Sequence, residues 1–222
     1  MAMDMNRRQI FASSAAGAAG LLLGGIGLST EPRTATASVS PASANDLVVI
    51  NQMQTGPWSS ENCGPTAAIV AMVASGYDPE EYEEGVNNGG PAVMEFRVHA
   101  ELSPSGRPDE KSVDYWGSDL SDLETGLSAN NVSNSRETYD TGLAEAQNGK
   151  SVILHVHHGT LIDDPDADYG HYVVARGTTD GGIAVSDPGR SSLGITGYSE
   201  SHLRESMVAN RGNDRAVVIS DA

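Results

Sequence analysis

The chain has 222 residues with 30 acidic and 13 basic side chains, which gives a net charge of −17, and it contains one cysteine. A surface this acidic repels nucleic acid and anionic membranes, so we exclude both as expected partners. One thiol also excludes a disulfide within the chain.

Residues 1–44 have the pattern of an export signal of the twin-arginine (Tat) type. Arg7 and Arg8 open it, and an apolar stretch rich in Gly, Ala and Ser follows at 10–28. That composition is typical of a removable signal, so we expect a secreted protein with no stable membrane anchor; an uncleaved, anchored form is the alternative. Two runs of small residues offer cleavage sites, and the later one is favoured. The remaining residues 45–222 suffice for one domain, expected to be a monomer.

The first half of this domain is expected to be mainly helical. Apolar spacing and capping residues predict helices that begin at 63 and at 78, and two more at 118–127 and 141–147. A short β-type run at 47–51 precedes them. Between 85 and 117 the signals are weak, and loops with one short helix are expected there.

The second half changes to a period of two. Four β-type runs are predicted at 151–156, 171–176, 183–185 and 216–219. A turn signal at 180–182 joins the second run to the third as a hairpin, and a helix is expected at 198–208. Helices followed by an antiparallel sheet define an α+β domain.

Cys63 is expected at the N-terminus of the first predicted helix. Pro65 suits the first turn, and the alanine-rich stretch 66–74 has the propensity to continue the helix. Unpaired backbone N–H groups and the helix dipole favour a thiolate at this position. Gly64 has no Cβ, which lets a substrate backbone approach the sulfur. Cys63 is therefore a candidate nucleophile, and an inert buried cysteine is the alternative.

A thiol nucleophile needs a base within hydrogen-bond reach and a third group that orients the base. Among the six histidines, His171 opens a predicted strand, so its ring can project from the end of the sheet toward a facing helix. Asp187 closes the neighbouring predicted strand. If the two strands pair, the carboxylate can accept a hydrogen bond from the imidazole and stabilise its charged form. Cys63, His171 and Asp187 thus form a candidate triad.

Three short motifs around these residues carry a resemblance to a known family. They are Asn-Cys-Gly-Pro-Thr-Ala at 62–67, Gly-His-Tyr-Val-Val at 170–174 and Ile-Ala-Val-Ser-Asp-Pro at 183–188. In sequence and order they resemble the nucleophile motif, histidine strand and Asp-Pro strand of papain-like cysteine peptidases of the bacteriocin-processing type, family C thirty-nine. The resemblance spans nearly the whole chain after the signal.

The resemblance implies a papain-like fold, in which an N-terminal helical part packs on a small antiparallel sheet. It implies a thiol-dependent hydrolase that cleaves a peptide or protein substrate through a Cys-His-Asp triad, with no cofactor and no metal. In that family a glutamine upstream of the cysteine donates its side-chain amide to the oxyanion. Gln52 is the candidate for this role, and Gln54 is the alternative.

Three other functions compete with this one. His155, His157 and His158 precede an acidic loop at 163–168, and two of these histidines with an aspartate could bind zinc. The same thioester chemistry could serve an amide or acyl transferase of the transpeptidase type, because hydrolysis and transfer differ only in the nucleophile that reaches the thioester. The same fold could also serve as a non-catalytic peptide-binding module, whose mark would be the loss of one triad member.

Overall fold

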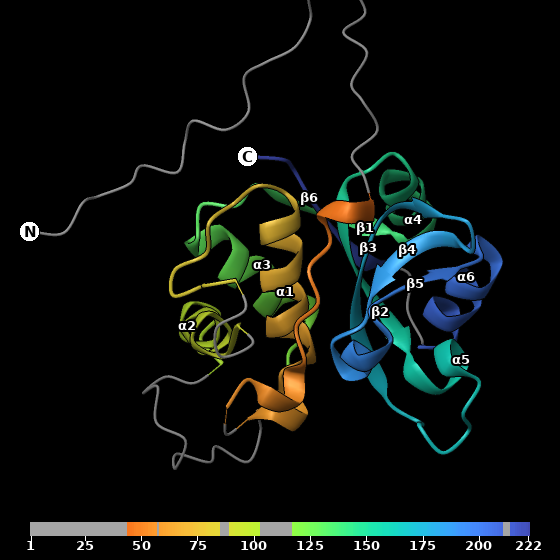
Figure 1. The fold of residues 1–222 in the computed structure, drawn as a ribbon, viewed down its shortest axis with the longest axis horizontal. Helices are drawn as coiled ribbons and strands as arrows, with labels where there is room; N and C mark the ends of the chain where they lie inside the picture. The colour runs from red at the N-terminus through yellow and green to blue at the C-terminus, as the bar shows by residue number, and fades with distance from the viewer. Residues whose placement is uncertain (1–43, 57, 85–88, 103–116, 211–213) are drawn as a thin grey trace, which may run out of the picture. The chain divides into compact units, whose positions relative to one another are not determined.

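A six-stranded antiparallel sheet forms the centre of the fold, in the order β1-β6-β2-β3-β4-β5 (Figure 1). The computed structural model describes residues 44–56, 58–84, 89–102, 117–210 and 214–222. These residues belong to one compact unit, Val39–Ala222. The expected export signal lies outside the described residues except for Ala44. Within the described residues, no helix has the length and apolar character needed to cross a bilayer.

The bounds of the helices and strands follow in chain order. The helical elements are η1 (Ala44–Asp46), η2 (Gln52–Gln54), η3 (Ser59–Glu61), α1 (Cys63–Ala74), α2 (Gly90–His99), α3 (Leu120–Ala129), α4 (Tyr139–Gln147), α5 (His158–Ile162), η5 (Pro188–Leu193) and α6 (Glu200–Ala209). The strands are β1 (Asn134–Thr138), β2 (Ser151–His157), β3 (Gly170–Thr179), β4 (Gly182–Ser186), β5 (Ile195–Tyr198) and β6 (Asp214–Ile219). The chain is therefore α+β, as its alternating patterns predict.

Both faces of the sheet are buried, because successive side chains of a strand point to opposite faces and both sets are apolar here. On β2, Ile153 packs with the helices α1, α2 and α3, whereas Val152 and Leu154 pack with α4 and α6. β3 behaves in the same way, with Val174 on the first face and Val173 on the second. The expected N-terminal helical part, α1 to α3, thus covers one face of the sheet, and α4 and α6 cover the other.

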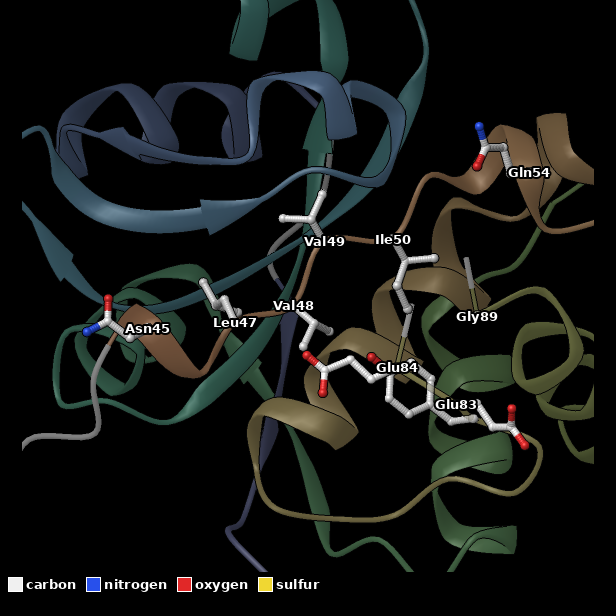
Figure 2. Close-up of a pocket in the computed structure, with 10 residues that line it drawn as sticks. Asn45, Leu47, Val48, Val49, Ile50, Gln54, Glu83, Glu84 and Gly89 are labelled. Atoms are coloured by element: carbon white, nitrogen blue, oxygen red, sulfur yellow. The ribbon is translucent and has the colours of Figure 1, made fainter. Parts of the chain in front are cut away.

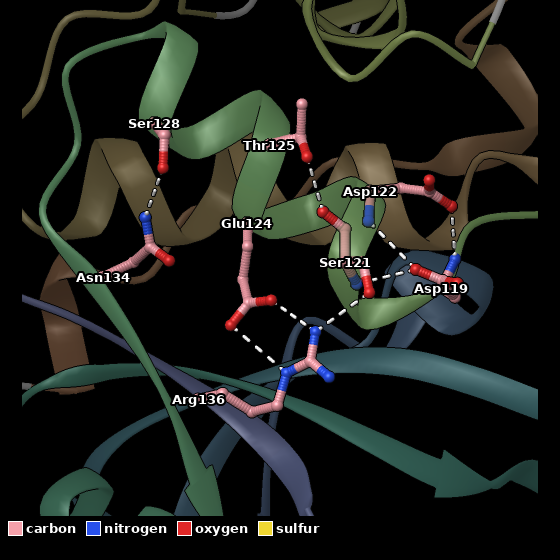
Figure 3. Close-up of polar contacts among 8 residues, drawn as sticks. All are labelled: Asp119, Ser121, Asp122, Glu124, Thr125, Ser128, Asn134 and Arg136. Carbon is pink, nitrogen blue, oxygen red and sulfur yellow. Dashed lines mark hydrogen bonds and ion pairs between the residues drawn. The ribbon is translucent and has the colours of Figure 1, made fainter.

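The helix α3 is fixed at its start and along its length by side-chain contacts (Figure 3). Asp119 accepts hydrogen bonds from the backbone N–H groups of Ser121 and Asp122, and Asp122 accepts one from Asp119 in return. This reciprocal capping box satisfies N–H groups that the helix cannot satisfy itself. Glu124 then forms an ion pair with Arg136 of β1, which ties α3 to the edge of the sheet.

Two elements expected from the sequence do not form. The run 47–51 is an extended segment without strand pairing, because β5 already occupies the free edge of β4. Its Leu47 and Ile50 are buried instead. The segment after Asp78 makes a turn, with a hydrogen bond from the Tyr82 N–H to the Pro79 carbonyl. The capping residues are present there, but the glutamates that follow give a helix no apolar face to bury.

Three short elements were not predicted. β1 is polar, and β5 is four residues long and contains a glycine. Both are edge strands whose side chains are at least partly exposed. Neither therefore shows a clear alternation of apolar and polar residues. The one-turn helix α5 begins directly where β2 ends. The helix α2 is the one short helix expected between 85 and 117, and residues 103–116 of that stretch lie outside the described part.

Candidate active site

Cys63 is the first residue of α1 and is half-buried. A buried polar network fixes the residue before it: Asn62 accepts a hydrogen bond from Nη1 of Arg97 at 2.9 Å and donates one to Oγ1 of Thr55 at 2.8 Å. The backbone carbonyl of Asn62 accepts the first helical bond, from the Thr66 N–H. Because both the backbone and the side chain of Asn62 are engaged, the start of the helix has little freedom to move.

Gly64 has a different role from the one expected. A Cβ at this position would lie 1.9 Å from Oγ of Ser118 and 3.2 Å from a methyl group of Leu123. The missing side chain therefore allows α1 to pack closely against the start of α3. This tight contact does not give a substrate backbone access to the sulfur.

His171 and Asp187 come together from paired strands. His171 is the second residue of β3 and lies opposite Val156 of β2, whereas Asp187 directly follows β4 and caps η5. Nε2 of His171 lies 2.7 Å from Oδ1 of Asp187, and the same oxygen accepts a hydrogen bond from the Gly189 N–H at 2.8 Å. Cys63 lies close enough to His171 to raise the pKa of the imidazole. Since Nε2 faces the carboxylate, Nδ1 is the ring nitrogen available to the sulfur.

The electrostatics of this pair favour a charged imidazole. Burial disfavours the imidazolium, but the interactions with Asp187 and Cys63 outweigh burial and raise the pKa of His171 from 6.5 to about 9. Burial would likewise raise the pKa of Asp187, but hydrogen bonds and attraction to His158 and His171 hold it well below its usual range. At neutral pH, Asp187 is therefore an anion and His171 a cation.

Cys63 and His171 line a cavity of about 460 Å³. The residues that line it come from η2, η3, the start of α1, the start of β3 and η5, and they are Gln52, Met53, Ser60, Glu61, Cys63, Tyr169, Gly170, His171 and Gly189. Gln52 is buried, and its Nε2 donates one hydrogen bond to the Ser59 carbonyl at 3.2 Å. An amide nitrogen carries two hydrogens, so Gln52 keeps a second donor for a ligand in this cavity.

Gln54 does not share this cavity. It lines a larger one, of about 780 Å³, with the extended segment 45–50 and the acidic turn that contains Glu83 and Glu84 (Figure 2). This second cavity contains no cysteine, serine or histidine among its lining residues. Of the two glutamines considered for the oxyanion, only Gln52 lies beside Cys63 and His171.

The three histidines of the zinc hypothesis diverge. His155 stacks on the ring of Tyr172, with centroids 4.3 Å apart, and His157 pairs with Asp168 at 2.9 Å. His158 turns the other way, toward Asp187. In the described part of the chain, two groups could offer three ligands to a metal, one made of His158, His171 and Asp187 and one made of Glu80, Glu95 and His99. Neither contains His155 or His157, so the zinc hypothesis built on those two residues is wrong for this fold.

The position of His158 beside Asp187 is the feature that sequence reasoning missed. In a regular strand, His158 would share the face of Val156, the residue that lies opposite His171. β2 ends at His157, and Nε2 of His158, the first residue of α5, lies 3.6 Å from Oδ2 of Asp187. Two adjacent histidines at a strand end were the only signal in the sequence.

Comparison with known proteins adds no relative to this picture. No model of a protein family matches the chain, and a search of curated proteins finds no similar sequence.

Proposed function

We propose that this chain is a thiol-dependent hydrolase that cleaves peptide or amide bonds through Cys63, His171 and Asp187. The observation that carries the proposal is the position of His171, which hydrogen-bonds the carboxylate through Nε2 at 2.7 Å and lines the same cavity as the only thiol of the chain. A nucleophile, a base and an orienting group in contact, beside a cavity, are the parts that covalent acyl transfer requires.

The proposed reaction is acyl transfer through a thioester. The Cys63 thiolate attacks a carbonyl carbon, and the resulting oxyanion receives hydrogen bonds from the Gln52 amide and the Cys63 backbone N–H. The imidazolium of His171 gives its proton to the leaving amine as the carbon–nitrogen bond breaks. Neutral His171 then takes a proton from water, which attacks the thioester and releases the acid and the thiolate. Asp187 keeps the imidazole oriented and stabilises its charged form.

The remaining parts of the proposal, on fold, substrate and export, rest on the sequence patterns and on the resemblance of the three motifs to papain-like cysteine peptidases. The fold is papain-like, with helices that carry the nucleophile packed on a sheet that carries the base. The substrate is a peptide or protein, and the reaction uses no cofactor. The protein is exported by the Tat route, loses residues 1–44 and acts as a secreted monomer. Its acidity, with a net charge of −17, keeps nucleic acid away.

Thiol labelling tests the core of this proposal without a known substrate. Purified protein is treated with iodoacetamide between pH 5 and pH 9, and the alkylation rate of Cys63 is compared with that of free cysteine. Activation predicts alkylation below pH 7 that is faster than for free cysteine, and its loss in His171→Ala. His99→Leu is a matched control, because His99 lies on α2 and pairs with Glu95 outside the cavity. A rate equal to that of free cysteine and unaffected by His171 contradicts the proposal.

A second experiment separates hydrolysis from the alternatives. A peptide library is incubated with the parent protein and with Cys63→Ala, with and without an added amine, and the products are identified by mass spectrometry. Hydrolysis predicts new carboxyl ends that require Cys63, whereas a transferase forms amides with the added amine. Peptides that bind equally to both proteins and stay intact indicate a binding module.

A further inference from the structure

Asp187 lies between two histidines rather than beside one. Its Oδ1 is fully occupied by His171 and by the Gly189 N–H. Its Oδ2 is buried and has no hydrogen-bond partner within normal distance, and Nε2 of His158 lies 3.6 Å from it. Nε2 of His158 is itself buried and without a partner. Two buried polar atoms, each lacking a bond, thus face one another.

We infer that His158 is a positioning residue of the proposed active site, which donates from Nε2 to Oδ2 of Asp187 and holds the carboxylate in the plane that serves His171. The inference rests on the proposed function and adds a fourth side chain to the triad. The side chains of His158 and Asp187 are 6% and 5% exposed, so water cannot substitute for either partner.

Tyr169 sets the tautomer of His158 that this role requires. The hydroxyl of Tyr169 lies 2.5 Å from Nδ1 of His158. The backbone N–H of His158 donates to the backbone carbonyl of Tyr169 at 2.9 Å. Burial, together with the negative charges of Asp187 and Cys63, raises the pKa of Tyr169, so its hydroxyl keeps a proton that it can donate to Nδ1 of His158. We infer this direction, because it leaves the Nε2–H of His158 facing Asp187.

The side chains form one hydrogen-bonded chain that begins and ends in the same cavity. With the His158–Asp187 bond that we infer, it runs from Tyr169 through His158 and Asp187 to His171, and Tyr169, His171 and Cys63 all line the cavity of about 460 Å³. The rings of His158 and His171 are 4.4 Å apart and tilted by 48°, so they also pack against each other. A ligand that bonds the Tyr169 hydroxyl is therefore linked to the carboxylate that orients the base.

The pKa of Asp187 also supports an interaction with His158. Burial is the largest influence on the pKa of Asp187 and would raise it; the contact with His158 lowers it, as does the bond with His171. The titratable groups that face Asp187 are His171 from β3, His158 from α5, and Tyr169 and Tyr198 at longer range. Loss of His158 leaves one oxygen of a buried anion without a counterpart.

The test uses the alkylation rate of Cys63 by iodoacetamide between pH 5 and pH 9, which needs no substrate. The variants are His158→Leu, which removes the donor, and His158→Gln, whose amide nitrogen can replace Nε2. Tyr169→Phe removes the hydroxyl at a residue that is 52% exposed and so tolerant of change. His99→Leu is the matched control, and thermal unfolding by circular dichroism shows which variants are folded.

The inference predicts that His158→Leu lowers the alkylation rate at pH 6 roughly ten- to a hundredfold and moves the acid limb of the pH profile, as expected when a buried charged group loses its partner. His158→Gln restores most of the rate, which a purely structural role would not require. Tyr169→Phe lowers the rate about two- to tenfold, and carries the test if His158→Leu does not fold. Equal rates and pH profiles in the parent and the folded variants overturn the inference. Slow alkylation in the parent itself, at the rate of free cysteine, overturns the proposed function instead.

Discussion

Replacing Asp187 by asparagine is expected to destabilise the fold in a pH-dependent way. Asparagine keeps the size and one acceptor oxygen of the side chain but removes the anion that faces His171 at 2.7 Å. The pKa of His171 is raised from 6.5 to about 9 in the folded chain. A difference of this size corresponds to about 3 kcal/mol of stability, part of which is due to Cys63 and the rest to Asp187.

The sign follows from the two protonation equilibria. Below pH 6.5 the imidazole is protonated in both the folded and the unfolded chain, so the full contribution of His171 is present, and it is lost as the pH rises through about 9. The pKa of Asp187 is lowered in the folded chain, so its contribution is present above its unfolded value of 3.8 and is lost only at lower pH. Of these two contributions, only that of His171 changes between pH 6 and pH 9.5.

Denaturant unfolding at pH 6 and pH 9.5 measures the effect. We expect Asp187→Asn to lose up to about 3 kcal/mol more, relative to the parent, at pH 6 than at pH 9.5. Asp168→Asn is the matched control: Asp168 also pairs with a histidine, at 2.9 Å, but its side chain is 88% exposed, so its loss is expected to cost under about 1 kcal/mol. Equal losses for Asp187→Asn at the two pH values, or losses no larger than in the control, refute the reasoning.

Four further substitutions test the candidate site and the packing of the helices. Gln52→Ala is expected to lower kcat by about 10²–10³-fold, whereas Gln54→Ala is expected to leave kcat unchanged. The reason is that only Gln52 lines the cavity of the thiol. Steady-state kinetics on a cleaved peptide measure both effects. Asn62→Ala is expected to lower the free energy of unfolding by about 2–4 kcal/mol, since it leaves the buried Arg97 guanidinium without its acceptor; urea unfolding measures the loss. Gly126→Ala places a Cβ 2.5 Å from the ring of a buried phenylalanine on α2. The overpacking costs about 1–3 kcal/mol, which outweighs a helix-propensity gain of about 1 kcal/mol. We therefore expect a lower melting temperature.

The sequence predicts the elements that carry Cys63, His171 and Asp187 because each lies at the end of a strongly patterned segment. A helix start and two strand ends are local features, set by capping residues and by alternation, and the two-residue turn between β3 and β4 brings the strands together. The proximity of His171 and Asp187 therefore follows from a short-range pattern, whereas that of Cys63 depends on the packing of α1 against β3.

His158 and the two edge strands could not be predicted in this way because tertiary contacts decide them. The direction of His158 depends on α5, which is held by a hydrogen bond from the Gly159 N–H to the Ala167 carbonyl across the acidic loop. β1 and β5 form because an exposed edge of the sheet is available to pair, whatever their own weak pattern. The failed helix after Asp78 shows the converse, since caps without an apolar face do not hold a helix.

The extended segment before η2 limits how far the amino end of the protein can be shortened. Leu47 and Ile50 are anchored in the core, and the carbonyl of Val48 accepts a hydrogen bond at 2.8 Å from Oγ of Ser186, the residue next to Asp187. A protease that removed the segment up to Ile50 would uncover apolar surface and release Gln52 from its place in the cavity. Under the proposed function, trimming that ends before Leu47 is expected to keep Gln52 in place, whereas deeper trimming is expected to abolish activity although Cys63, His171 and Asp187 remain.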